Sequence, residues 1–241
     1  MTTPLLELRE IYTSYGRSQV LFGVSLTIEK GACVCLLGRN GVGKTTTMRS
    51  IMGLTPASRG QVLWKGTDIT RWRPFEIARA GIGFVPEDRR VFADLTVREN
   101  LEVGARAAGR SGPWTIEAVF DLFPKLRELS GRRSGYLSGG EQQMLTIART
   151  LMGNPELLLL DEPSEGLAPL VVESLLEQVR ALKERGLTIL LAEQGLHFSL
   201  ALADYAYVLQ KGEVRYSGPS STLRDDPMLR DELLGLASMK V

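Results

Sequence analysis

Apolar residues along the chain follow two periods, which predict alternating strands and helices. Residues 6–12 and 24–28 alternate apolar and polar side chains, as half-buried strands do. Unbroken apolar runs at residues 32–37, 157–160 and 187–191 predict strands that are buried on both faces. Further strands are expected at residues 61–64, 82–85, 205–209 and 213–216, of which the last two form a hairpin.

Helical segments separate the buried strands. Helices are expected at residues 46–52, 74–80, 96–101, 115–123, 139–151 and 170–185, with a charged helical tail from Asp225. Continuous apolar strands separated by helices imply a parallel sheet covered on both faces. The two alternating strands near the N-terminus predict the antiparallel edge of a sheet. Between Leu95 and Met152 strand signals are absent, so this block predicts a helical subdomain within an α/β chain.

Composition narrows the class of protein. The 241 residues fit one large domain or a domain with a subdomain, and a net charge of +1 argues against a nucleic-acid surface. The chain has no apolar run near the roughly 20 residues that span a bilayer, and residues 1–4 lack the plan of a secretory signal. Cys33 and Cys35 alternate along a buried strand, which favours packed core over a metal site. We expect a cytosolic protein that reaches membranes through partners.

A glycine-rich loop lies between the predicted strand at residues 32–37 and the helix at 46–52. It fits the phosphate-binding pattern of a glycine, four free positions and Gly-Lys-Thr. Its residues, with the threonine that follows, are Gly38, Arg39, Asn40, Gly41, Val42, Gly43, Lys44, Thr45 and Thr46. The glycines allow successive backbone N–H groups to face one anion at a helix N-terminus. Lys44 is expected to reach the β- and γ-phosphates, and Thr45 to hold Mg²⁺.

Two carboxylates follow the apolar run at residues 157–160. Asp161 and Glu162 would lie at the C-terminal end of a parallel strand, where ligands bind in such sheets. Asp161 is placed to hold Mg²⁺, and Glu162 to accept a proton from the water that attacks the γ-phosphate. The alternative is that both acids merely cap the next helix.

A second glycine turn opens the predicted helix at residues 139–151. Its members are Ser138, Gly139, Gly140 and Glu141. Two glycines after a serine at a helix start form another anion site. One nucleotide does not need two such sites, so the economical explanation is a head-to-tail pair of chains. Each Ser138 turn would then cover the γ-phosphate held by the other chain's Lys44. An ordinary helix cap is the alternative.

Tyr15 stands in the loop between the first two predicted strands, before the phosphate loop. Its ring could stack on a purine base. The alternative is a tyrosine that only anchors its loop.

Taken together, these stretches resemble the ATP-binding subunits of ABC transporters, from the loop near residue 15 to the last hairpin. The resemblance rests on the phosphate loop, on residues 137–143 and on residues 160–163, in the family's order and spacing. It implies a P-loop NTPase fold of class α/β, with a RecA-like parallel-sheet core, an antiparallel β edge and an inserted α-helical subdomain. One ABC ATPase domain would span residues 1–241, with its core at 1–87 and 154–241 and the subdomain at about 88–153.

The resemblance also implies an activity. It predicts a Mg²⁺-dependent ATPase that works as a dimer with two composite ATP sites, with Tyr15 stacking on adenine. The helical subdomain would grip a cytoplasmic helix of a membrane-embedded partner, and the partners would include two transmembrane permease subunits. The protein would therefore be peripheral, on the cytoplasmic side of the inner membrane.

Three positions depart from the general family pattern. The family's γ-phosphate-sensing glutamine falls on Glu87, and its switch histidine falls on Gln194. Glutamine keeps a donor for the γ-phosphate but removes a titratable group. Glu87 needs water, Mg²⁺ or a donor between it and the phosphate, because two anions repel, so we place it among the metal ligands. His197 is expected to be a helix-face residue, and Ala168 replaces the family's aspartate.

These departures occur together in one branch. With Arg90-Val91-Phe92 and residues 166–169, they resemble one ATPase of the branched-chain amino acid uptake systems. That resemblance implies a five-part assembly with a periplasmic solute-binding protein, two permeases and two ATPases. The chain would pair with a second, related ATPase as a heterodimer, or with itself. Relatives with such motifs carry urea, amides or aromatic acids, so the solute does not follow from the motifs.

Other functions are weaker interpretations of the same fold. Lipid or lipopolysaccharide export ATPases generally keep the sensing glutamine and the switch histidine, so Glu87 and Gln194 count against that class. ATPases of DNA ends need long coiled-coil arms, and ribosomal ones usually carry two cassettes. A GTPase is disfavoured because the chain lacks an Asn-Lys-x-Asp stretch.

Overall fold

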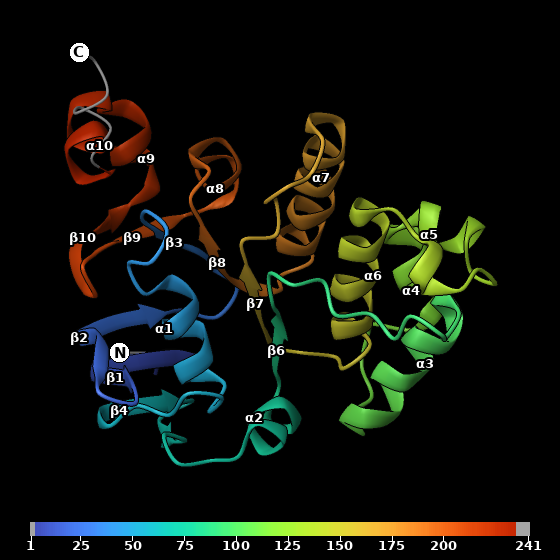
Figure 1. The fold of residues 1–241 in the computed structure, drawn as a ribbon, viewed down its shortest axis with the longest axis horizontal. Coiled ribbons are helices and arrows are strands. Elements are labelled where there is room, and N and C mark those ends of the chain that lie inside the picture. Colours follow the sequence, from blue (N-terminus) through green and yellow to red (C-terminus); the bar gives the residue numbers. More distant parts are fainter. Residues whose placement is uncertain (1–2, 235–241) are drawn as a thin grey trace.

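A six-stranded sheet runs through the middle of the molecule (Figure 1). The structure, a computed structural model, describes residues 3–234. The strands of this sheet are β3 (Cys33–Leu37), β6 (Ile82–Val85), β7 (Leu157–Asp161), β8 (Thr188–Glu193), β9 (Tyr205–Gln210) and β10 (Glu213–Pro219). Their order is β10-β9-β3-β8-β7-β6; β10 runs antiparallel to β9, and the other neighbours are parallel. The predicted parallel sheet is confirmed.

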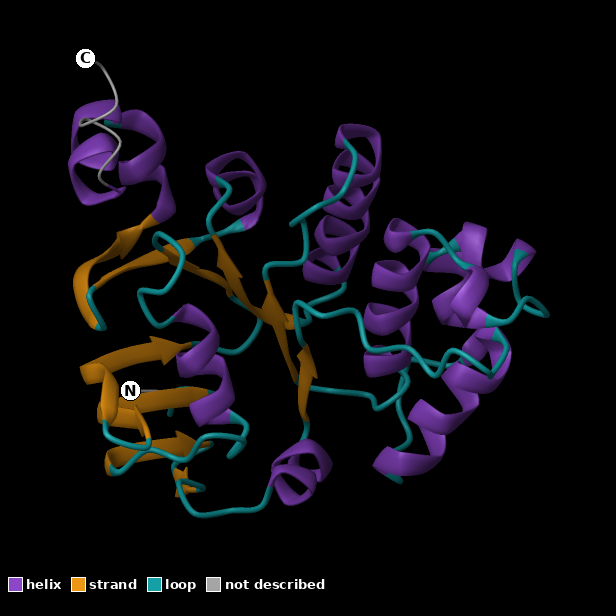
Figure 2. Ribbon diagram, in the orientation of Figure 1, coloured by secondary structure: helices purple, strands orange, loops and turns teal. Residues whose placement is uncertain are grey.

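The two faces of this sheet are covered by different layers. Successive residues of a strand point to opposite faces. Leu157 and Leu159 pack into the core that contains α1 (Lys44–Ile51), whereas Leu158 and Leu160 pack into the core that contains α7 (Pro169–Glu184). Figure 2 shows the orange strands with purple helices on both sides. A strand between two apolar layers needs apolar residues at every position, which explains the unbroken run.

Both cysteines lie within β3 and are buried, as expected. Cys33 faces the core around α7, and Cys35 faces a third apolar cluster below α8 (Leu196–Leu202). Both thiols are free. Burial raises the pKa of Cys33 to about 12, which keeps it protonated and unreactive.

A second, antiparallel sheet packs against the face that carries α1. It contains β1 (Leu6–Tyr15), β2 (Ser18–Ile28), β4 (Arg59–Trp64) and β5 (Thr67–Asp68), in the order β2-β1-β4-β5. The expected antiparallel edge is therefore a separate sheet. Within residues 3–234, β1 pairs with β2 on one side and β4 on the other, and none of these four strands pairs with a strand of the six-stranded sheet.

The block between β6 and β7 is helical, as predicted. Its members are α3 (Val97–Ala108), α4 (Ile116–Leu122), α5 (Pro124–Glu128), a 3₁₀ turn (Ser134–Tyr136) and α6 (Gly139–Leu151), grouped at the right of Figure 1. A capping box opens α3: Thr96 N–H donates to Glu99 Oε2 at 2.7 Å, and Glu99 N–H donates to Thr96 Oγ1 at 3.2 Å. The sequence did not reveal α5 or the 3₁₀ turn. With five and three residues, these elements are too short to show a helical repeat of apolar positions.

The remaining helices are α2 (Pro74–Ala80), α8, α9 (Ser220–Asp225) and α10 (Pro227–Leu234). The predicted helical tail is therefore present to Leu234, and residues 235–241 lie outside the described part of the chain. Within residues 3–234, no helix has both the length and the apolar composition that crossing a membrane requires.

Asn100 is a fully buried polar residue that joins three segments of the helical block. Its side-chain oxygen accepts from Phe92 N–H at 3.0 Å, and its amide donates to Phe92 O at 3.0 Å. The amide also reaches Thr96 O at 3.0 Å and Ser134 Oγ at 2.9 Å. Buried polar groups with a complete set of partners specify one arrangement of the segments that they join.

We predict that Asn100→Ala destabilises the protein by about 2–4 kcal/mol, because several buried groups lose their partner. Urea denaturation of the purified chain measures this free energy. Arg98→Ala is the matched control, since Arg98 is an exposed residue of the same helix, and it should change stability by less than about 0.5 kcal/mol. Equal stability of the two variants would contradict the structural role of Asn100.

Candidate functional site

The phosphate loop connects the C-terminal end of β3 to α1. Gly38, Gly41 and Gly43 have positive φ values of 153°, 79° and 113°. A Cβ at Gly43 would lie 2.6 Å from Leu21 Cδ2, so only glycine fits this left-handed position against β2. The sequence pattern of glycines thus becomes a turn that ends directly at the first residue of α1. A small cavity of about 90 Å³ lies against Gly41, Gly43 and Thr45.

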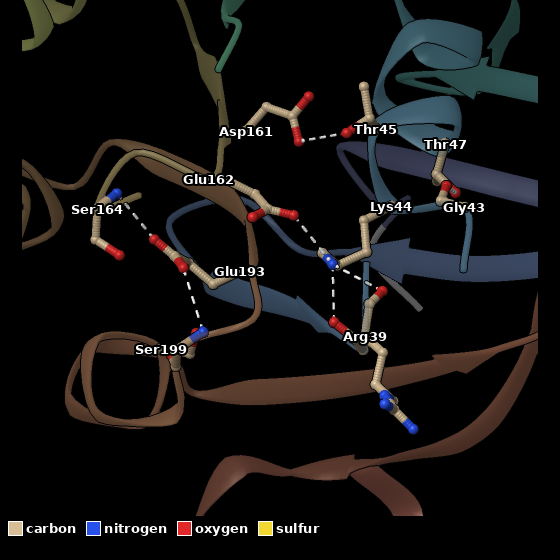
Figure 3. Close-up of polar contacts among 12 residues, drawn as sticks. Arg39, Gly43, Lys44, Thr45, Thr47, Asp161, Glu162, Ser164, Glu193 and Ser199 are labelled. Carbon is tan, nitrogen blue, oxygen red and sulfur yellow. Dashed lines mark hydrogen bonds and ion pairs between the residues drawn. The ribbon is translucent and has the colours of Figure 1, made fainter. Parts of the chain in front are cut away.

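Lys44 is buried beneath this loop. Its side chain is 3% exposed, and Nζ donates to Gly38 O at 2.8 Å and Arg39 O at 3.1 Å. Nζ also lies 3.0 Å from Glu162 Oε1. Figure 3 shows Lys44 and Glu162 pointing toward one another across the site. The structure therefore joins the two residues that the sequence assigned to phosphate binding and to proton transfer.

Asp161 ends β7 beside the start of α1. Thr45 Oγ1 donates to Asp161 Oδ1 at 3.1 Å, and Oδ2 is buried without a hydrogen-bond partner in the described chain. Burial raises the pKa of Asp161 to about 6, with further contributions from the nearby charges of Glu162 and Glu87. An unpartnered carboxylate oxygen next to a threonine hydroxyl fits the oxygen ligands that Mg²⁺ prefers.

Glu162 occupies a special backbone position. Its φ is +45°, which is uncommon outside glycine and is often found at functional sites. Its backbone N–H donates to Ala192 O at 2.9 Å, so the turn after β7 is fastened to β8. A hydrogen bond with the Glu162 side chain raises the pKa of Glu165 to about 7, so the Glu165 carboxyl retains part of its protons near neutral pH.

The serine-glycine turn opens α6. Ser138 is the N-cap, and its N–H donates to Glu141 Oε2 at 2.8 Å, which completes a capping box. Gly140 is close-packed, since a Cβ there would lie 2.6 Å from Val171 Cγ1. Within residues 3–234, no hydrogen bond or ion pair joins this turn to the phosphate loop. The turn thus caps α6, and a second role remains a prediction.

The positions that depart from the family pattern lie on loops or at element ends. Glu87 follows β6 and is exposed, and Gln194 follows β8 and is exposed. His197 lies on the solvent side of α8, with Nδ1 3.9 Å from Glu173 Oε1. Ala168 is the N-cap of α7 and lacks a side-chain cap. In the part of the chain that is described, no three acidic, histidine or cysteine side chains form a metal cluster, so the metal role of Glu87 remains a prediction.

Tyr15 lies at the end of β1 and is 45% exposed. The hairpin that it begins returns through Val20 and Leu21, which contact Gly43 of the phosphate loop. An exposed tyrosine ring on a hairpin that borders the phosphate loop is accessible for stacking on a purine base. Stacking itself remains a prediction.

The structure adds two residues that the sequence reasoning did not single out. Glu193 ends β8 and accepts from Ser164 N–H at 3.0 Å. Arg89 donates to Glu165 O and packs against Gly139. For Glu193 a signal was present, because it follows an apolar strand just as Asp161 does. For Arg89 no such signal was present, because the residues that it contacts lie 50 and 76 positions further along the chain.

Comparison with known proteins gives matches along nearly the whole chain. The family model described as "ABC transporter" matches residues 21–165. A high-affinity branched-chain amino acid transport ATP-binding protein, BraG of Pseudomonas aeruginosa, is 40% identical over 96% of this chain and 100% of its own length. The lipopolysaccharide export system ATP-binding protein LptB of Acidithiobacillus ferridurans is 34% identical over 96% of this chain and 97% of its own length. The solved structure of the ADP conformation of MJ1267, an ATP-binding cassette of an ABC transporter, superposes on this chain with a TM-score of 0.82. The two chains are 31% identical, and the match covers 96% of this chain and 98% of that one.

We predict that Lys44→Ala weakens ATP binding roughly 10- to 100-fold, because hydrogen bonds to charged groups contribute about 1.5–3 kcal/mol. Isothermal titration with ATP measures the dissociation constant. Lys65→Ala is the control, since that ammonium pairs with Glu156 at 2.6 Å, outside the site. An unchanged ATP affinity for Lys44→Ala would remove Lys44 from the phosphate site.

Proposed function

The chain belongs to the ABC transporter family as an ATP-binding subunit, and from this premise we propose how its site uses ATP. Two cassettes bind Mg²⁺ and ATP between them and hydrolyse the γ-phosphate bond to drive uptake of a branched-chain amino acid or a related small molecule. The observation that carries the proposal is the buried contact of Lys44 with Glu162 beside the Thr45–Asp161 pair.

Phosphate binding rearranges this contact. In the structure, Lys44 Nζ is shared between two loop carbonyls and the Glu162 carboxylate. An incoming triphosphate offers Lys44 a stronger anion and repels Glu162, since like charges that lie close together oppose each other. Glu162 is thereby released from Lys44 and becomes free to bind a water molecule.

Hydrolysis then needs a general base. The Glu162 carboxylate takes a proton from the water whose oxygen attacks the γ-phosphorus, while the bond to the β-phosphate oxygen breaks and ADP leaves. Thr45 and Asp161 would hold Mg²⁺, which supplies charge neutralisation at the β- and γ-oxygens. Gln194 would donate its amide hydrogens to the γ-phosphate, and Glu87 would approach it through the metal or water. Tyr15 would stack on adenine.

A second cassette completes the site. Among the described residues, 3–234, the Ser138 turn makes its hydrogen bonds within its own helix start and none with its own phosphate loop, which supports a role toward another chain. Backbone N–H groups at the start of the 13-residue helix α6 favour an anion. The partner is a related ATPase in a heterodimer, or a second copy of this chain.

A hollow on the surface is suited to a membrane-embedded partner. It has a volume of about 600 Å³ and lies between α2, β6, α3 and α6. Phe75 and Phe92 line it and remain 48% and 49% exposed. Arg79 lies 5.6 Å from the Phe75 ring and Arg149 lies 4.8 Å from the Phe92 ring. An apolar groove with cations at its rim fits a short amphipathic helix that carries an acidic residue.

We assign this groove to a cytoplasmic helix of the permease subunits, which would hold the chain at the cytoplasmic side of the inner membrane. In this assignment the core comprises residues 1–87 and 154–241, and the helical subdomain about 88–153. The groove lies where these two parts meet. A periplasmic binding protein would take part only through the permeases.

The cargo follows from the relatives rather than from the site. The similarity to BraG supports uptake of branched-chain amino acids as the function of this chain. The LptB likeness supports the alternative, an ATPase of a lipid or lipopolysaccharide exporter. We favour uptake because identity to BraG is higher and covers all of that protein.

We predict that Glu162→Gln keeps ATP binding and lowers the rate of hydrolysis roughly 10²- to 10⁴-fold, the usual contribution of a general base. With Mg²⁺ and ATP, this variant should accumulate as a closed dimer on size-exclusion chromatography with its partner ATPase, or alone if it pairs with itself. Glu156→Gln, at the opposite edge of the sheet, should hydrolyse ATP normally. If Glu162→Gln hydrolysed ATP at the wild-type rate, Glu162 would be excluded as the general base.

We predict that deletion of the gene abolishes high-affinity uptake of radiolabelled leucine, isoleucine or valine by cells, because the ATPase supplies the energy. The wild-type gene should restore uptake and the Glu162→Gln gene should not. Normal uptake of all three amino acids, together with loss of lipopolysaccharide from the cell surface, would establish the exporter instead.

A further inference from the structure

Glu193 is a buried carboxylate that the hydrolysis scheme does not use. It is the last residue of β8 and only 2% exposed. Burying a carboxylate is unfavourable unless hydrogen bonds or an opposite charge compensate. In the described part of the chain, no lysine, arginine or histidine pairs with it. Its compensation therefore comes from backbone N–H groups.

The two oxygens of Glu193 hold two different loops. Oε1 accepts from Ser164 N–H at 3.0 Å, and Oε2 accepts from Gly195 N–H at 3.4 Å. Figure 3 shows Glu193 lying between Ser164 and the start of α8, next to Glu162. Ser164 stands two residues after Glu162, and Gly195 directly follows Gln194.

Glu193 is the hydrogen-bonded link between these loops. Among the residues that the structure describes, no direct hydrogen bond joins residues 163–168 to residues 194–199. Gly195 is in turn held to α8, because Ser199 Oγ donates to Gly195 O at 3.0 Å. The Glu193 carboxylate thus connects the Ser164 loop to the residue that follows Gln194.

We propose that Glu193 is a positioning residue that couples the loop of the general base Glu162 to the loop of Gln194. This inference rests on the proposed function and deepens it. Glu162 must act on the attacking water while Gln194 contacts the γ-phosphate, so both loops must hold one relative position during hydrolysis. A misplacement of about 1 Å can lower a rate roughly 10²-fold.

The chemistry requires a carboxylate rather than an amide. Two backbone N–H donors need two acceptors, and a glutamine offers one oxygen and one NH₂ group. Glu193→Gln keeps the shape of the side chain, yet its NH₂ group would oppose one of the two N–H groups. The glutamine oxygen would keep the shorter bond, to Ser164 N–H at 3.0 Å, and the NH₂ group would face Gly195 N–H, whose bond is 3.4 Å long. The Gln194 loop is then released while the core packing around β8 is preserved.

The test uses the full-length chain, assembled with its transporter partners. We expect Glu193→Gln to lower kcat roughly 10- to 100-fold, with ATP affinity within about twofold of wild type because Lys44 and the phosphate loop are untouched. In a Gln194→Ala background, the same substitution should lower kcat by less than about twofold, since its effect acts through the Gln194 loop. Glu156→Gln, at the amino end of β7, is the matched control.

Three results would overturn the inference. They are a normal kcat for Glu193→Gln, a loss that multiplies fully with that of Gln194→Ala, or a fall in ATP affinity and melting temperature that accounts for the loss of activity. If Glu193→Gln does not fold, Glu193→Asp retains the charge but is one methylene shorter, and it should show the same non-additivity with a smaller loss. Absence of ATPase activity in the wild-type assembly would instead refute the proposed function.

Discussion

Parallel pairing of β3, β8 and β7 is the constraint on which the site depends. In a parallel sheet all carboxyl ends lie at one edge, so loops from distant parts of the chain meet there. The register pairs Leu37 with Glu193 and Asp161 with Ala192. It thereby brings together the phosphate loop, the two acids after β7 and the loop after β8. A slip of one residue would turn these side chains to the opposite face.

The contact of Lys44 with Glu162 gives this edge its chemical character. Both side chains are largely buried, where charges interact more strongly than in water. Glu162 also lies among other acids, and a hydrogen bond with it raises the pKa of Glu165 to about 7. In the proposed function this accumulation of negative charge makes the arrangement responsive to phosphate, because Lys44 has to exchange one anion for another.

The segment after β6 connects this edge to the rest of the molecule. Within six residues it carries Glu87 near Asp161, Arg89 against Gly139 and Glu165, and Phe92 in the surface groove. Asn100 holds the Phe92 backbone by both its N–H and its carbonyl. In the proposed function, one short stretch of chain therefore joins the ATP site, the start of α6 and the surface groove, and it would link ATP hydrolysis to movement of a partner.

The sequence alone determined the α/β class, the parallel sheet and the loop that ends at Lys44, because apolar periods and glycine positions are local properties. It also indicated Asp161 and Glu162, since acids after a buried strand point to one known edge. Only the tertiary structure decided that the antiparallel strands form their own sheet, that Lys44 contacts Glu162, and that Glu193 and Arg89 join separate loops. Those contacts depend on which strands become neighbours, and residues more than 100 positions apart, such as Lys44 and Glu162, leave no local pattern by which to predict them.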